Sequence, residues 1–178
     1  MITEVKGNEL YFARVRESAI IPSKKLEDAG YDLYSNFEGD YFVIEAGKTR
    51  PTPTGIATAF SSKYYIQVEE RGSTGKIGVK KSSGVIDSGY RGEYFIMLYN
   101  TNDKPFVISK LEDSTPDEFE VDGKLYKKDE CVMYPYSKAI CQLVVQEIPV
   151  MEEKEISYEE LQAIASERGT GKFGSSGK

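Results

Sequence analysis

Apolar residues recur along the chain in short runs with a period of two, the spacing of a β-strand that buries one face. In Tyr64–Glu69, for example, apolar side chains occupy every second position. Similar short segments, separated by Gly, Pro, Asn and Asp, are Leu10–Val15, Asp40–Ile44, Gly55–Phe60 and Ala139–Glu147. Strands of this length at regular intervals predict an all-β domain, either a sandwich or a barrel.

One run of apolar residues, Tyr94–Tyr99, shows no alternation, which predicts a strand buried on both faces. Before it, Val85-Ile86 has the pattern of a strand end and Ser88-Gly89 that of a two-residue turn. Together these segments predict a tight hairpin. Asp87 would stand beside the turn, with Tyr90 close enough to wall the same pocket.

Length and charge limit the class of ligand. A chain of 178 residues fits one domain with a real core. The formal net charge is −6, and no cluster of Lys and Arg is long enough to follow a polynucleotide. A free nucleotide is therefore a better expected ligand than DNA or RNA. The chain has no histidine, so a carboxylate must supply any general base at neutral pH.

The two cysteines, Cys131 and Cys141, lie in apolar stretches without the spacing of a redox or metal motif. We expect buried free thiols, in agreement with a reducing cytoplasm. The segment Met1–Tyr11 contains charges and no sustained apolar core, and no apolar run is long enough to cross a membrane. These features predict a cytoplasmic protein without a membrane segment.

The C-terminal segment changes in composition. Ser157 and Glu160 precede an apolar stripe that begins at Leu161, a capping-box pattern that predicts a helix of one or two turns. From Arg168 onward the chain is rich in Gly, with Phe173 as a single aromatic residue. Such a segment has too little apolar surface to order itself. It is either a frayed terminus or an arm that becomes ordered over a ligand.

Five segments resemble, in chain order, the five motifs of the trimeric dUTP diphosphatases, the dUTPases. The hairpin segment resembles the third motif, and the Gly-rich terminus resembles the fifth. The five segments are Ala29–Leu33, Glu70–Gly75, Gly84–Glu93, Ala139–Leu143 and Arg168–Gly177. Each is short, but five in order make the resemblance specific.

The resemblance implies a jelly-roll-like β-barrel over residues 1–160 and a flexible arm over residues 161–178 that closes over an active site. It also implies a homotrimer whose active sites lie between subunits, and the phage-encoded type is one candidate within the family. The implied reaction is the Mg²⁺-dependent hydrolysis of dUTP between its α and β phosphates, giving dUMP and diphosphate.

The resemblance further implies a role for individual residues. Asp87 would hold and deprotonate the attacking water, and Asp32 would contact Mg²⁺ through another water. Tyr90 would lie against the deoxyribose and exclude a 2′-hydroxyl, and Phe173 would stack on the base. The residues implied to bind the substrate are Arg71, Gly72, Ser73, Gly84, Val85, Ile86, Tyr90, Gln142, Arg168, Phe173, Gly174 and Ser175.

Some of these positions have a second explanation. Asp32 also fits a turn residue at a strand end, and Gln142 a satisfied polar group in the core. The family commonly has Ser where this chain has Gly72, so both Gly72 and Ser73 are candidates for the phosphate contact. Ala139 replaces the usual Arg of the fourth motif, which predicts the loss of a structural ion pair.

The related dCTP deaminases share the Asp-x-Gly turn, but the resemblance implies that their reaction needs a Glu where this chain has Met97. A methionine cannot transfer a proton, so we reject deamination.

Residues 102–128 appear as an insertion relative to a compact member of the family. They are acidic at first and then apolar and aromatic. Phage-encoded dUTPases often carry extra residues here, and some use them to engage other proteins. The segment is therefore either a solvated loop or a surface for a protein partner. The second explanation would add a regulatory role to catalysis.

Overall fold

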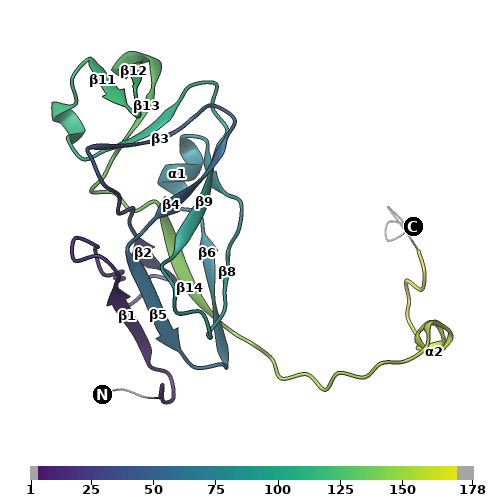
Figure 1. Cartoon of the computed structure of the whole chain (residues 1–178). Helices are drawn as coiled ribbons and strands as arrows, with labels where there is room; N and C mark the ends of the chain where they lie inside the picture. The colour runs from purple at the N-terminus through teal and green to yellow at the C-terminus, as the bar shows by residue number, and fades with distance from the viewer. Residues whose placement is uncertain (1–3, 172–178) are drawn as a thin grey trace. The chain divides into compact units, whose positions relative to one another are not determined.

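The computed structural model describes residues 4–171, and within them the chain is mostly β-strand (Figure 1). The predicted all-β class is confirmed. Contacts divide the chain into two units, Met1–Ile148 and Pro149–Lys178, and every strand belongs to the first. Among the described residues, hydrogen bonding leaves the sheets open rather than closing them into one barrel. The jelly-roll-like barrel and the boundary after residue 160 stay predictions.

Two sheets carry the residues of the candidate site. The first has the order β2-β14-β6-β8 and the second the order β4-β9-β7, all antiparallel. Their strands are β2 (Tyr31–Leu33), β14 (Cys141–Glu147), β6 (Tyr64–Glu69), β8 (Val85–Ile86), β4 (Thr49–Pro53), β9 (Phe95–Asn100) and β7 (Val79–Lys81).

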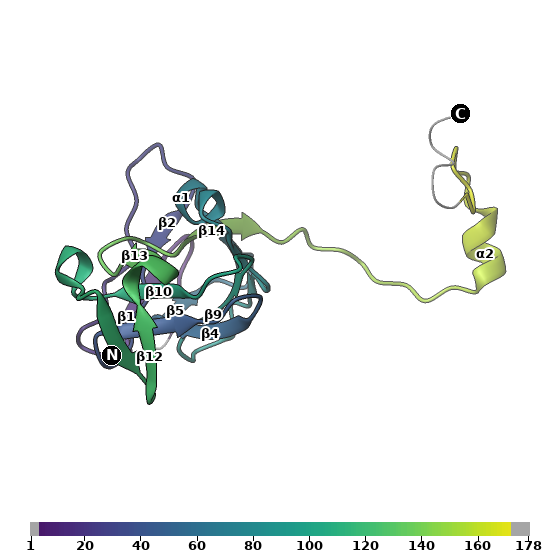
Figure 2. The ribbon, with the colours of Figure 1, turned by 90° about the horizontal axis from the view of Figure 1, so that it is seen from above.

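Three smaller sheets complete the described part of the first unit, with the orders β1-β5, β13-β10-β3 and β11-β12 (Figure 2). In the second of these sheets β10 and β13 run parallel. Their strands are β1 (Leu10–Arg14), β5 (Ile56–Phe60), β13 (Val132–Pro135), β10 (Phe106–Ser109), β3 (Tyr41–Ile44), β11 (Glu118–Val121) and β12 (Lys124–Lys127). The helices are α1 (Gly72–Lys76), α2 (Tyr158–Ala163), η1 (Glu112–Ser114) and η2 (Lys128–Glu130). None of the helices between residues 4 and 171 is long and apolar enough to span a bilayer.

Several predicted elements are confirmed. In β6, Ile66 and Val68 are buried, with half-buried residues between them, as the alternation predicts. In the second unit, the N–H of Glu160 donates to the Ser157 hydroxyl at 3.1 Å, and the N–H of Ser157 donates to the Glu160 carboxylate at 2.8 Å. This capping box begins α2, which has the predicted length of less than two turns.

The predicted hairpin is wrong. The turn itself is present, because the N–H of Tyr90 donates to the carbonyl of Asp87 at 3.1 Å. However, β8 pairs with β6, whereas β9 pairs with β4 and β7 in another sheet. The connection of residues 87–94 is too long for a two-residue hairpin loop, and it carries the chain from one sheet to the next. Asp87 and Tyr90 therefore lie between two sheets.

The predicted burial of both faces of β9 is also wrong. Ile96 and Leu98 point into the core, but Phe95 is 46% exposed and Tyr99 is 36% exposed. A continuous apolar run occurs both in a strand buried between two layers and in a strand with only one buried face, so the run alone does not tell the two apart. In this chain the second face borders a pocket and solvent.

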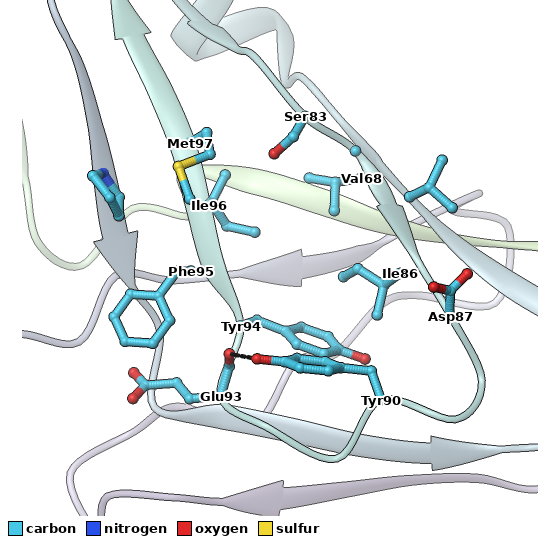
Figure 3. A pocket seen from close by; sticks show the side chains of 13 residues that line it. Val68, Ser83, Ile86, Asp87, Tyr90, Glu93, Tyr94, Phe95, Ile96 and Met97 are labelled. Atoms are coloured by element: carbon cyan, nitrogen blue, oxygen red, sulfur yellow. Dashed lines mark hydrogen bonds between the residues drawn. The ribbon is translucent and has the colours of Figure 1, made fainter.

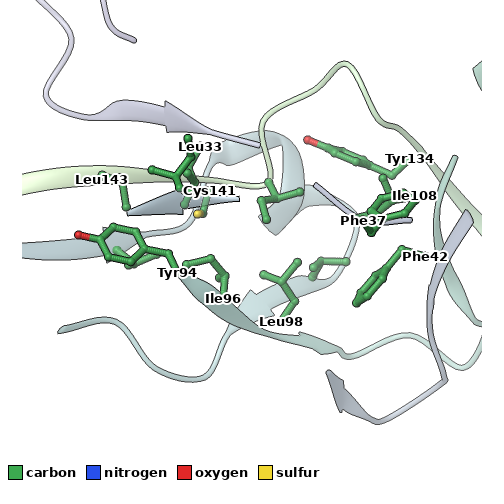
Figure 4. Packing of buried hydrophobic residues seen from close by; sticks show 14 of the residues in the cluster. Leu33, Phe37, Phe42, Tyr94, Ile96, Leu98, Ile108, Tyr134, Cys141 and Leu143 are labelled. Atoms are coloured by element: carbon green, nitrogen blue, oxygen red, sulfur yellow. The ribbon is translucent and has the colours of Figure 1, made fainter. Parts of the chain in front are cut away.

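The main core lies between the sheets and joins residues from both ends of the first unit (Figure 4). Leu33, Ile96, Cys141 and Leu143 are among its buried members. Burial raises the pKa of the Cys141 thiol, so this group stays neutral. Cys141 is a buried free thiol as expected, while the free thiol of Cys131 is only half-buried.

The expected insertion, residues 102–128, is only partly a surface segment. It contains β10, whose four residues are all buried, with Phe106 and Ile108 in the main core. The rest includes the hairpin β11-β12, and in it Phe119 and Tyr126 bury themselves against Val43 and Val107 in a small cluster of their own. The apolar run that forms β10 is short and adjoins acidic residues, so local composition does not distinguish it from the exposed part of the segment.

Candidate functional site

A pocket of about 470 Å³ opens between β8, the loop after it, and β9 (Figure 3). This volume is within the range of small-molecule pockets. All five candidate residues from the third motif line it, namely Gly84, Val85, Ile86, Asp87 and Tyr90. The opposite wall comes from the outer face of β9, with Phe95 and Met97. The structure therefore brings together the part of the site that would face a nucleoside.

The backbone on one side of the pocket is positioned by a close contact at Gly84. A Cβ atom there would lie 2.8 Å from the side-chain nitrogen of Gln67 and 3.1 Å from the carbonyl of Val68. The carbonyl of Gly84 accepts a hydrogen bond from the N–H of Val68 at 2.7 Å. Within the described residues β8 is an edge strand, so its outer backbone groups have no neighbouring strand. Such groups can pair with the polar edge of a ligand.

Tyr90 forms an exposed aromatic surface on the pocket. Its ring stacks on that of Tyr94 with centroids 6.1 Å apart, and its hydroxyl donates to the carbonyl of Glu93 at 3.0 Å (Figure 3). Tyr94 is buried, which raises its pKa to about 12, and its hydroxyl is hydrogen-bonded to that of Thr58. The ring of Tyr94 is thus a fixed support for the ring of Tyr90.

A second cluster joins the candidate residues of motifs one, two and four. Asp32 on β2 and Gln142 on β14 are cross-strand partners. The Nε of Arg71, at the start of α1, lies 3.2 Å from Oδ1 of Asp32, and an η nitrogen of Arg71 donates to the carbonyl of Ala139 at 3.4 Å. The side-chain amide of Gln142 donates to the carbonyl of Glu70 at 3.1 Å. This cluster combines a cation, a carboxylate and an amide at the surface.

Two local features shape the second cluster. A Cβ atom at Gly30 would lie 2.8 Å from Oε1 of Gln142, so this glycine makes room for the amide. Gly72 and Ser73 form the exposed first turn of α1. The first N–H groups of a helix have no intrahelical acceptor, and they can face an anion. Gln142 is half-buried rather than part of the core.

The candidate residues thus form two clusters, and no hydrogen bond or ion pair within residues 4–171 joins the two. Arg168 belongs to the second unit, is exposed, and donates from Nε to the carbonyl of Gly171 at 3.3 Å. Phe173, Gly174 and Ser175 lie outside the described residues.

The prediction missed several residues that line the pocket. Glu93 is the last residue of the third-motif segment and Tyr94 follows it directly, but Pro51 comes from β4 and is brought near by pairing with β9. Only the spacing from Asp87 could have suggested Glu93 and Tyr94. Nothing in the local sequence connects Pro51 to a pocket.

The comparisons with known proteins agree with this fold. The model of the dUTPase family matches residues 16–112. The deoxyuridine 5'-triphosphate nucleotidohydrolase of Debaryomyces hansenii is 33% identical over 164 residues, which cover 91% of this chain and 83% of that protein. The Pol polyprotein of Ovine maedi visna related virus is 37% identical over 101 residues, which cover 57% of this chain and 9% of the polyprotein.

Among solved structures, a mutant of the Staphylococcus bacteriophage 80alpha dUTPase with dUpNHpp superposes with a TM-score of 0.71. The identity is 25%, and the alignment covers 97% of this chain and 100% of that one. Together these findings define an all-β hydrolase of nucleotides. The chain belongs to the dUTPase family, and it is an enzyme of the dUTP diphosphatase class.

Proposed function

We propose that the chain hydrolyses dUTP to dUMP and diphosphate, with Asp87 activating the attacking water. The observation that supports this most directly is the pocket in which Asp87 lies at the rim beside Tyr90 and the edge strand β8 (Figure 3). A carboxylate is the expected base because the chain has no histidine. The free backbone edge of Gly84–Ile86 would pair with uracil, and Tyr90 would lie against the deoxyribose.

The phosphate chain would bind to the second cluster and to the arm. Arg71 supplies a planar cation that can form two hydrogen bonds to a phosphate. Gln142 and either Gly72 or Ser73 would add uncharged donors, and Arg168 a further cation. These groups would neutralise the charge that spreads over the phosphate oxygens during in-line attack. The arm residues Phe173, Gly174 and Ser175 would cover the base and phosphates and exclude water.

Mg²⁺ fits the donors that the chain offers. Within residues 4–171 no three acidic or cysteine side chains gather as a metal cage. Mg²⁺ commonly binds through one or two carboxylates, retained waters and substrate phosphates, and Asp32 is an oxygen donor with a third of its side chain exposed. Asp32 would hold the ion through a water, and the bound ion would supply charge neutralisation on the phosphates.

The two clusters of one chain would serve two different sites in a homotrimer. In such a site one subunit would supply the nucleoside pocket and another the phosphate cluster, as the resemblance to the trimeric dUTPases implies. Symmetric oligomers repeat such a shared site at each interface. The arm of 161–178 would close over the same site.

One measurement tests the proposed reaction. Release of diphosphate should be rapid with dUTP and slow with dTTP, dCTP and UTP, and it should depend on Mg²⁺. Comparable rates with all four nucleotides would contradict the assigned pocket. Ammonia release from dCTP would instead indicate deamination, which Met97 at the pocket wall cannot support.

A second experiment tests the shared site. Arg71→Ala and Asp87→Asn chains should each be nearly inactive as homotrimers. When the two are co-assembled in equal amounts, about a quarter of the shared sites combine an intact Arg71 with an intact Asp87, and activity should return accordingly. No return of activity in verified mixed trimers would place both residues of a site on one chain.

A second candidate role concerns the hairpin β11-β12. It is an ordered element with its own small core, yet Leu125 near its tip is 61% exposed. We propose that this hairpin provides a surface for a protein partner alongside catalysis. Its acidic approach and its exposed apolar tip supply the charge and the anchor that such contacts use.

A further inference from the structure

Two distant segments of the chain contact the side chain of Glu93, which is only 10% exposed. An η nitrogen of Arg16 lies 3.0 Å from Oε2 of Glu93, and the backbone N–H of Gly55 donates to Oε1 at 2.8 Å. The other η nitrogen of Arg16 donates to the carbonyl of Asn36. Both oxygens of the carboxylate are therefore bound, and the guanidinium is itself fixed. Charge-assisted bonds of this kind are stronger and more directional than neutral ones.

The ion pair of Arg16 and Glu93 forms a clamp, and it fixes the same stretch of backbone that holds Tyr90. The Tyr90 hydroxyl donates to the carbonyl of Glu93, and the ring lies directly over Gly92. A Cβ atom at Gly92 would clash with the Tyr90 hydroxyl oxygen. The ring also stacks on that of Tyr94, with centroids 6.1 Å apart. A movement of residues 92–93 would therefore move the ring.

We propose that Arg16 and Glu93 are positioning residues that hold Tyr90 against the sugar and thereby set the preference for deoxyribose over ribose. This inference rests on the proposed function, in which Tyr90 faces the sugar. The Tyr90 ring can exclude a 2′-hydroxyl only if the ring cannot move aside by the size of that group. Because Tyr90 is 47% exposed, its ring needs support from neighbouring residues to stay in place. The clamp supplies this support through the backbone of Glu93, whose carbonyl accepts the hydrogen bond from the Tyr90 hydroxyl.

A purely structural role for the ion pair makes a different prediction. If Arg16 and Glu93 only joined segments of the fold, their loss would lower the amount of active protein and would affect dUTP and UTP equally. If they position Tyr90, their loss should change the ratio of kcat/KM for dUTP to kcat/KM for UTP. That ratio is independent of the active fraction when both substrates are measured on one preparation.

The experiment compares Glu93→Gln and Arg16→Met with two other variants. Arg14→Met is the matched control, because Arg14 donates to the carbonyl of Ala19 near the same corner and does not reach Glu93. Tyr90→Leu removes the wall itself. We expect the dUTP-to-UTP ratio to fall about tenfold in Glu93→Gln and Arg16→Met, a typical loss for one poorly fitted group. Arg14→Met should keep the ratio of the unmodified chain.

A ratio that stays within about twofold in both clamp variants would overturn the inference. So would an unchanged ratio in Tyr90→Leu, because the clamp acts through that ring.

A crystal structure of Glu93→Gln gives a readout that does not depend on turnover. Displacement of the Tyr90 hydroxyl from the carbonyl of residue 93 supports the inference, and an unmoved ring contradicts it. If the unmodified chain did not hydrolyse dUTP, the proposed function would fail, and this structure would still decide on the clamp.

Discussion

At the scale of single residues, Asp87 differs from the other acidic candidate. Asp32 is paired with Arg71, whereas within residues 4–171 the carboxylate of Asp87 has no hydrogen-bond or ion-pair partner. Asp87 is exposed at the rim of the pocket, where a water molecule can reach it. An unpaired carboxylate in this place is suited to accept a proton rather than to hold the fold together.

We therefore expect Asp87→Asn to lower kcat by a factor on the order of 10²–10⁴ while nucleotide binding stays nearly normal. An amide can hold a water but cannot take its proton. Diphosphate release measures kcat, and calorimetry with dUMP measures binding. Asp103→Asn, an exposed substitution between β9 and β10, is the control. Near-normal turnover in Asp87→Asn would remove this residue from its proposed role.

What the sequence could show at this scale depended on sequence distance. Asp87 and Tyr90 are three positions apart, so their common pocket could be predicted from spacing. Arg16 and Glu93 are 77 positions apart, and no local pattern links them. The pairing of Arg71 with Asp32 likewise depends on how β2 and α1 are placed by the sheet.

At the scale of elements, the edge strand β8 depends on a position without a side chain. Gly84→Ala should raise the KM for dUTP about tenfold, because the added Cβ would press on the carbonyl of Val68 and on Gln67 and shift β8 at the base-pairing edge. Gly89→Ala is a matched control in the same segment, since nothing lies within 4 Å of its Cβ position. Steady-state kinetics on both variants check this. Equal effects of the two substitutions would argue against a specific role for β8.

The hairpin β11-β12 can be removed without cutting the core. The N–H of Lys128 donates to the carbonyl of Asp117 at 2.8 Å, so the ends of the hairpin are adjacent. We expect a chain with Gly-Gly in place of residues 118–127 to hydrolyse dUTP normally and to lose some thermal stability, because Phe119 and Tyr126 no longer cover Val107. Removal of residues 102–128, by contrast, should prevent folding, because β10 is lost with them.

The same shortened chain tests the second candidate role. Cross-linking and pull-down from the native host with full-length and shortened baits should show a partner that only the full-length chain retains. Identical partner sets would leave the hairpin without a binding role.

The elements that were predicted correctly carry their signal locally. The period of two in β6 and the capping box of α2 each lie within a few residues. The hairpin and the doubly buried β9 were wrong because pairing and layering are decided by distant segments, here β6 for β8 and β4 for β9. Local pattern identified strands, and the contacts between them required the structure.

At the scale of the whole molecule, we expect truncation after Glu167 to leave a folded and nearly inactive protein. The main core lies wholly within Met1–Ile148, so the last residues contribute little to stability, whereas Arg168 would be lost from the phosphates. Circular dichroism and melting temperature check the fold, and diphosphate release checks activity. Unfolding on truncation would make the arm structural. Full activity would show that the arm has no part in the reaction.

The outer face of β9 has a consequence for how the protein must be handled. A single chain leaves Phe95 and Tyr99 exposed on one face of β9, with Met97 between them and Pro51 of β4 opposite Met97. An apolar surface of this kind is costly in water until another surface covers it. If a second subunit provides that cover, folding and association are linked, and dilution alone should lower the melting temperature and the specific activity together.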